Sequence, residues 1–258
     1  MDSVSSADGT MIAYESSGGG PPIILVGGAF NDRSTTRALA AALASDFTAY
    51  SYDRRGRGDS GDSGPYAVQR EIEDIAALIG AAGGSAYLYG LSSGAILAAY
   101  ATAEGLPVAG LALFEPPFQV GPHGGTKPEL AERLTELVSA GRRGDAVELF
   151  LTEAVGVPAQ AVAGMRAAPE WSWMEGLAHT LAYDTTVTGD GALPADRLAA
   201  ITVPTVVLDS TGSPEWLREA AGATAGVIPG ATRLSLEGGF HDVPPEVLAP
   251  AMRDALLG

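Results

Sequence analysis

Residues 86–100, AYLYGLSSGAILAAY, contain the stretch that decides the fold of this chain. Ala86–Tyr89 is a short strand-like run, and residues 95–100 are good helix formers. Between them lies Gly90-Leu91-Ser92-Ser93-Gly94, a G-x-S-x-G motif. A strand, a sharp glycine-flanked turn and a helix together predict a nucleophile elbow, which projects the hydroxyl of Ser92 from the end of a sheet. The amino terminus of the following helix favours a developing negative charge there.

Short apolar runs alternate with helical patterns along most of the chain. Several runs are apolar throughout and bounded by glycine or proline, which is typical of strands covered on both faces in a largely parallel sheet. We expect strands at Met11–Tyr14, Ile23–Val26, Thr48–Tyr52, Ala86–Tyr89, Leu111–Phe114, Val206–Leu208 and Thr232–Leu236. We expect helices over Thr35–Ala44, Ile72–Ile79 and Ser93–Ala103 and after Pro244-Pro245. The alternation predicts an α/β fold, with a mostly parallel central sheet flanked by helices.

The alternation is interrupted between residues 121 and 196, where only helical periodicity remains. Strand-like sequence resumes at Ile201 and continues to Leu208. A helical segment between two strands is best explained as a cap over one end of the sheet. We therefore predict a core of residues 1–120 and 197–258, with a helical cap of residues 121–196 inserted before the penultimate strand.

Composition excludes several classes of function. The formal charge is −16 and Lys127 is the single lysine, so neither nucleic acid nor an anionic membrane surface is an expected partner. The absence of cysteine excludes disulfides, zinc–thiolate sites and a thiol nucleophile. The amino terminus lacks the features of a signal peptide and no later apolar run is long enough to span a bilayer, which predicts a cytoplasmic protein. The oligomeric state is left open, a homo-oligomer included.

A serine nucleophile needs a base within hydrogen-bond reach, and the chain offers His123, His179 and His241. His123 lies in a loop at the boundary of the predicted cap, and His179 lies in a helical pattern that favours a packed side chain. His241 lies between the last expected strand and the last helix. In a parallel sheet that loop opens on the same edge as the turn at Ser92, so His241 is the predicted base.

The transition state of acyl transfer also needs donors for an oxyanion. Ile23–Val26 runs into the pair Gly27-Gly28, which lets the backbone bend so that the N–H of Ala29 faces the serine. The second predicted donor is the N–H of Ser93, directly after the nucleophile. Neither a metal nor an organic cofactor is implied by these residues.

With those pieces in place, the chain resembles the α/β-hydrolase superfamily over nearly its whole length. The likeness is carried by residues 26–30 (VGGAF), 52–60 (YDRRGRGDS), 90–94 (GLSSG) and 238–242 (GGFHD). It is greatest to small capped bacterial hydrolases and looser to cofactor-free haloperoxidases and esterases. The resemblance implies a structural role for the charges of residues 53–60. Many members have His-Gly where this chain has Gly27-Gly28.

The resemblance leaves the acid that orients His241 ambiguous. Some members take this acid from the loop after the penultimate strand, and they have aspartate where this chain has Ser213. Other members take the acid from the end of the preceding strand, where this chain has Glu115. Glu115 is our first candidate and Asp209 the second. Glu115 follows its strand and precedes Pro116-Pro117, which fix an extended turn. Asp209 comes directly after an apolar run, and as a residue still on the strand it would point to one face of the sheet.

These residues predict a serine hydrolase that cleaves an ester, lactone or thioester through an acyl-enzyme on Ser92. The expected partner is a small-molecule substrate with a bulky apolar group, and the candidate side chains that bind it, most of them in the cap, are Phe30, Trp171, Trp173, Met174, Leu177 and Tyr183. Ordinary packing within the cap explains the cap residues equally well. Two alternatives remain. The fold could serve a lyase, perhydrolase or biosynthetic cyclase, which product analysis would reveal. A non-catalytic receptor would bind a small molecule without covalent labelling at Ser92.

Overall fold

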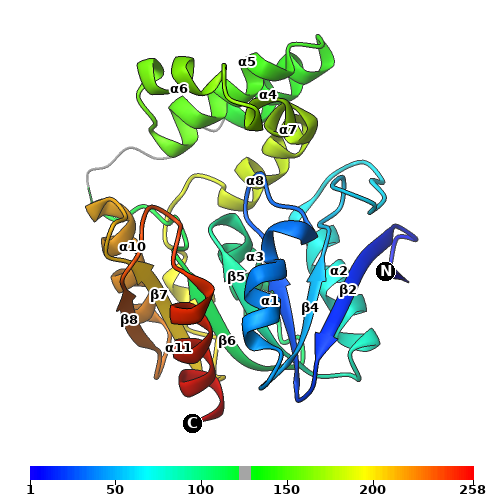
Figure 1. The fold of residues 1–258 in the computed structure, drawn as a ribbon, viewed down its shortest axis with the longest axis vertical. Helices are drawn as coiled ribbons and strands as arrows, with labels where there is room; N and C mark the ends of the chain where they lie inside the picture. Colours follow the sequence, from blue (N-terminus) through cyan, green and yellow to red (C-terminus); the bar gives the residue numbers. More distant parts are fainter. Residues whose placement is uncertain (122–128) are drawn as a thin grey trace.

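The computed structural model describes residues 1–121 and 129–258, which form one twisted sheet covered by helices (Figure 1). The strands are β1 (Asp2–Ser5), β2 (Met11–Gly18), β3 (Pro22–Val26), β4 (Thr48–Tyr52), β5 (Ala86–Leu91), β6 (Val108–Phe114), β7 (Thr205–Ser210) and β8 (Thr232–Leu236). Their order across the sheet is β1-β2-β4-β3-β5-β6-β7-β8. β2 runs antiparallel to both its neighbours, and the other neighbouring pairs are parallel. The predicted fold class is confirmed.

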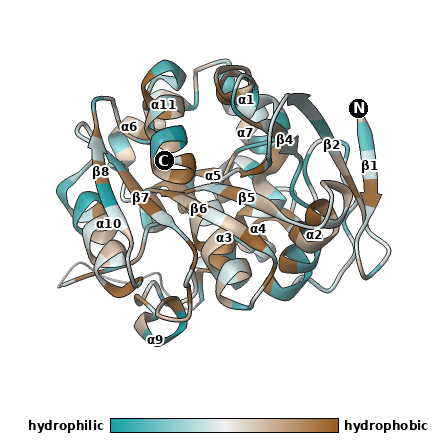
Figure 2. Cartoon of the chain, turned by 90° about the horizontal axis from the view of Figure 1, so that it is seen from below, coloured by the Kyte–Doolittle hydropathy of each residue, from teal (hydrophilic) through white to brown (hydrophobic). Residues whose placement is uncertain are grey.

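Helices form a layer on each face of the sheet (Figure 2). One layer contains α2 (Val68–Ala81), α3 (Ser93–Ala103), α9 (Ala195–Leu198) and α10 (Glu215–Val227), and the other contains α1 (Arg37–Leu43) and α11 (Pro245–Leu257). Along β3, Ile24 and Val26 pack into the first layer, and Ile23 and Leu25 into the second. Because successive side chains of a strand point to opposite faces, a strand covered on both faces is apolar throughout.

A helical segment lies between β6 and β7. It contains α4 (Leu130–Ser139), α5 (Arg143–Phe150), a π-helical turn (Leu151–Val155), α6 (Ala159–Met165), α7 (Glu170–Leu177), a 3₁₀ turn (Ala178–Thr180) and α8 (Leu181–Thr188). These helices bury their own apolar core, and Figure 1 shows α4 to α7 as a separate layer over one end of the sheet. The exact limits of a cap stay a prediction, since residue 196 falls inside α9 and residues 122–128 lie outside the described part of the chain.

The seven expected strands all form, and β4 and β8 have the predicted bounds. β1 was not predicted, because Asp2–Ser5 is a polar segment at the edge of the sheet that pairs on one side only. The helix over Ser93–Ala103 has the predicted bounds, whereas the first part of Thr35–Ala44 is a 3₁₀ turn that leads into α1. Among the described helices, none combines the length and hydropathy needed to cross a membrane.

Candidate active site

Ser92 lies at the sharp turn between β5 and α3. Its backbone has φ 56° and ψ −123°, a conformation that L-residues rarely adopt, and its N–H donates to the carbonyl of Phe114 over 2.9 Å. The turn requires both flanking glycines. A Cβ on Gly90 would come within 2.4 Å of the carbonyl oxygen of Gly94, and a Cβ on Gly94 within 2.4 Å of that of Val26. The motif therefore packs strand and helix together closely enough to hold Ser92 at the sheet end.

The His241 ring contacts Glu115. Nδ1 of His241 lies 2.5 Å from Oε2 of Glu115, whose side chain is completely buried. The second carboxylate oxygen of Glu115 accepts the backbone N–H of Ser210 over 2.8 Å. Because a carboxylate accepts hydrogen bonds, this contact favours the tautomer with the hydrogen on Nδ1, which leaves Nε2 as the nitrogen that accepts a proton.

Asp209 does not contact His241. It lies inside β7, and its carboxylate accepts hydrogen bonds from Nε of Arg233 (2.7 Å) and from the hydroxyl of Ser235 (2.9 Å), both on β8. Ser213 is the position at which the resemblance implies an aspartate in some members, and its hydroxyl accepts the backbone N–H of His241 over 3.4 Å. Of the two candidate acids, the structure brings only Glu115 to the histidine.

Backbone strain gathers around these residues. In residues 1–121 and 129–258, the non-glycine residues with positive φ are Phe30 (57°), Ser92 (56°), Glu115 (49°) and His241 (51°). Such conformations cost about 1–3 kcal/mol each and cluster at functional sites, where the surrounding structure enforces them. Phe30 directly follows the glycine turn after β3, so each strained residue belongs to one of the segments that carry the predicted site.

The backbone groups predicted to bind an oxyanion lie beside Ser92. Ala29, Ser92, Ser93 and His241 all line one cavity. Ser93 is the first residue of α3, so its N–H has no acceptor within the helix. The N–H of Ala29 is not taken up by another group in the described part of the chain. In the described part of the chain, both N–H groups are therefore free to donate to a bound group.

This cavity has a volume of about 70 Å³. The sequence did not predict most of its lining. The lining residues come from the loop after β6, from α5 and the π-helical turn, from α8, and from the segments before and after β8. They are Pro117, Gln119, Phe150, Ala154, Val155, Asp184, Thr185, Thr188, Trp216 and Phe240. Phe240 could have been found from its place beside His241, whose ring it contacts at a centroid distance of 4.5 Å. The Ser92 hydroxyl and the His241 ring share this cavity without a hydrogen bond between them; such bonds often tighten only when substrate is bound.

The six predicted substrate-binding side chains do not line this cavity, and most of those in the helical segment serve its own packing or its contact with the core. Trp171 and Met174 belong to the buried core of that segment, Leu177 is buried, and Trp173 is 41% exposed. Tyr183 stacks on Tyr66 and donates to Asp62. Phe30 packs edge-on against Phe150, so it supports the cavity wall from behind. None of the six is among the residues that line the cavity at Ser92.

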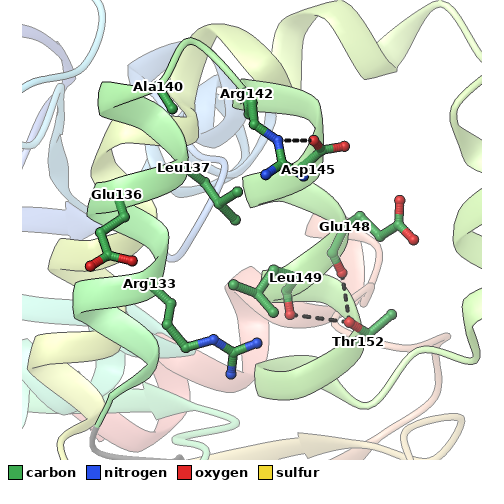
Figure 3. Close-up of a pocket in the computed structure, with 9 residues that line it drawn as sticks. All are labelled: Arg133, Glu136, Leu137, Ala140, Arg142, Asp145, Glu148, Leu149 and Thr152. Carbon is green, nitrogen blue, oxygen red and sulfur yellow. Dashed lines mark hydrogen bonds and ion pairs between the residues drawn. The ribbon is translucent and has the colours of Figure 1, made fainter.

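Two further features of the helical segment lie outside this site. His179 bonds to Arg143 and, through Nε2, to the carbonyl of Gly56 over 2.7 Å, which is a structural contact with the core. His123 lies outside the described residues. A larger hollow of about 510 Å³ lies between α4 and α5, and Figure 3 shows its charged rim. It contains none of the residues predicted to carry chemistry.

The charges of residues 53–60 bond within the protein. The carboxylate of Asp53 accepts the backbone N–H groups of Arg33 (2.7 Å) and Asp59 (2.9 Å), which closes the turn. Arg55 pairs with Asp74 and Asp8. This arrangement agrees with the structural role that the resemblance implied for the segment.

The fold and the residues at the end of β5 define a protein of the α/β-hydrolase class. Residues 23–250 match the model of the Alpha/beta hydrolase family, and the chain belongs to this family. An alpha/beta hydrolase from Sphaerobacter thermophilus is 50% identical, with a TM-score of 0.94 and all of both chains covered. A thermophilic esterase from Thermogutta terrifontis is 25% identical over 99% of this chain and 97% of its own, with a TM-score of 0.73. No curated protein matches the chain.

Proposed function

We propose that this protein is a serine hydrolase that cleaves an ester, lactone or thioester of a small apolar substrate through an acyl-enzyme on Ser92. The contact between His241 and Glu115, which leaves Nε2 as a base in the cavity of Ser92, carries the proposal. Membership of a hydrolase family and the likeness to the esterase from Thermogutta terrifontis support hydrolysis as the reaction.

In this reaction Nε2 of His241 takes the proton of the Ser92 hydroxyl while Oγ attacks the substrate carbonyl. The N–H groups of Ala29 and Ser93 donate to the oxyanion of the tetrahedral intermediate. His241 then gives the proton to the leaving group, and an acyl-enzyme remains. His241 next activates a water molecule, which attacks the acyl carbonyl and releases the carboxylic acid product and free Ser92. Glu115 holds the ring and stabilises its charged form throughout.

The cavity supports a small acyl group. Its volume of about 70 Å³ is small beside the about 300–1,000 Å³ of pockets that take drug-sized ligands. Apolar side chains, among them Phe150, Val155 and Trp216, form much of the wall. Esters of short, uncharged acyl groups are therefore the substrates that fit this cavity.

Hydrolysis of p-nitrophenyl acetate by the protein and by its Ser92→Ala variant tests the proposal. We expect the wild-type protein to release p-nitrophenol and acetate, and the variant to lose this activity while keeping its circular dichroism spectrum. Wild-type rates in the variant would contradict a nucleophilic role for Ser92.

A further inference from the structure

A buried carboxylate of α8 lies in the wall of the cavity at Ser92, next to Ser93. Asp184 is 1% exposed and accepts three hydrogen bonds, from the hydroxyl of Ser93 (2.6 Å), from Nη1 of Arg54 (2.7 Å) and from Nη2 of Arg57 (2.8 Å). Ser93 supplies one of the two proposed oxyanion donors. Asp184 therefore joins a helix of the segment between β6 and β7 to the residue that follows the nucleophile.

The same two arginines hold the loop that carries the other donor. Nη1 of Arg54 donates to the carbonyl of Gly27 over 3.1 Å, and Nη1 of Arg57 donates to the carbonyls of Gly28 and Asn31. These carbonyls flank Ala29 in the chain. One carboxylate thus fixes both sides of the oxyanion site, directly through Ser93 and through the arginines on the side of Ala29.

The charges of this cluster balance. Glu71, also buried, forms two 2.6 Å hydrogen bonds with Arg54, so two arginines face two carboxylates. Burial opposes the ionisation of Asp184, but Arg57, Arg54 and the bond from Ser93 outweigh it and hold the pKa of Asp184 below its ordinary value. The cluster is therefore a buried network of charge-assisted hydrogen bonds, each with a defined donor and acceptor.

We infer that Asp184 is a positioning residue that sets the geometry of the oxyanion site by holding Ser93 and, through Arg54 and Arg57, the loop before Ala29. The inference rests on the proposed function. Asp184 acts through these neighbours, and its effect falls on the transition state, in which the oxyanion forms, more than on the bound substrate.

The sign of the charge separates positioning from a direct electrostatic effect. Replacing Asp184 by asparagine removes a negative charge close to the forming oxyanion, which by charge alone would favour the transition state. Asparagine also has one oxygen where aspartate has two, so it cannot accept from Ser93, Arg54 and Arg57 in the same way. A fall in kcat therefore reports lost geometry.

The test compares Asp184→Asn with Asp74→Asn, which is the matched control. Asp74 is likewise 1% exposed, lies on a helix and pairs with a buried arginine, Arg55, but this pair contacts neither Ser93 nor the loop at Ala29. The measurements are kcat and KM for p-nitrophenyl acetate, and Ki for phenyl trifluoromethyl ketone, whose serine adduct places an oxyanion at the proposed donors. Thermal unfolding of both variants gives the loss of stability.

We expect Asp184→Asn to lower kcat about 10- to 100-fold with little change in KM, less than the about 10²–10³-fold for deleting a donor. Ki for the ketone should rise by a similar factor. Asp74→Asn should leave kcat and Ki near the wild-type values, even if it lowers Tm as much as Asp184→Asn does. Equal kcat and Ki values for the two variants would overturn the inference.

Ser93→Ala provides a second variant in case Asp184→Asn does not fold. It removes the hydroxyl that bonds to Asp184 and keeps the backbone N–H, so kcat should fall and Ki for the ketone should rise. Unchanged values would count against the inference. Lack of ester turnover by the wild-type protein, in contrast, would reject the proposed function itself, which keeps the two failures distinct.

Discussion

Two buried carboxylates lie at the ends of neighbouring strands, and only one of them meets the histidine. Glu115 follows β6 and Asp209 lies near the end of β7, and both are fully buried. Glu115 bonds to His241 and to the backbone of Ser210, whereas Asp209 bonds to Arg233 and Ser235 on β8. The same chemical group at the same edge of the sheet thus bonds to the histidine in one case and to the neighbouring strand in the other.

The position of each residue relative to its strand end explains the difference. Asp209 is still inside β7, so its side chain points to one face of the sheet, where β8 offers a cation and a hydroxyl. Glu115 is the first residue beyond β6, and its positive φ turns the chain there before Pro116-Pro117. A place just past the strand end, instead of inside the strand, thus directs a carboxylate over the sheet edge.

The largest effect expected from this comparison is on turnover. Glu115→Gln should lower kcat for an ester by about 10⁴-fold, as loss of the acid does in a serine protease, while Asp209→Asn should cost ~10-fold or less. Glutamine keeps the size of Glu115 but does not stabilise the charged ring of His241. The rates are to be compared where circular dichroism shows that both variants are folded.

The reverse order of these rates would make Asp209 the acid and reject the argument from strand ends. If both variants kept wild-type rates, neither carboxylate would act on His241.

A smaller effect is expected on stability. Glu115→Gln should lower the free energy of unfolding by about 1–3 kcal/mol, because the N–H of Ser210 and the Nδ1–H of His241 both need an acceptor and an amide offers one oxygen. Asp209→Asn should cost about 1 kcal/mol or less, since the Ser235 hydroxyl can rotate to accept a hydrogen bond and the Arg233 side chain is 38% exposed to water. Urea unfolding of the two variants measures this difference in the free energy of unfolding. A larger loss of free energy in Asp209→Asn than in Glu115→Gln would show that the pairing of β8 depends on Asp209 more than we infer.

The sequence predicted the parts of the molecule that depend on local pattern and strand order. The apolar runs located the parallel strands, and the glycine-flanked motif located Ser92 at the end of β5. Because parallel strands end at one edge of the sheet, the sequence also predicted that His241 and Glu115 are neighbours. In the structure, Nδ1 of His241 lies 2.5 Å from Oε2 of Glu115.

The lining of the cavity could not be predicted in this way, because it depends on how the segment between β6 and β7 packs. Its aromatic residues looked like substrate contacts, but Trp171 fills the core of that segment and Tyr183 stacks on Tyr66. Trp216, at the start of α10, lines the cavity although its sequence context shows no motif. The bond between Asp184 and Ser93, 91 positions apart in the chain, has no signal in sequence spacing.

Reaction with a fluorophosphonate probe, followed by peptide mapping, tests the central claim most directly. The probe phosphonylates a serine that a neighbouring base activates. We predict rapid labelling of Ser92 alone in the wild-type protein and in Asp209→Asn, and slow labelling in Glu115→Gln. An unlabelled wild-type protein, or a label on another serine, would contradict the account.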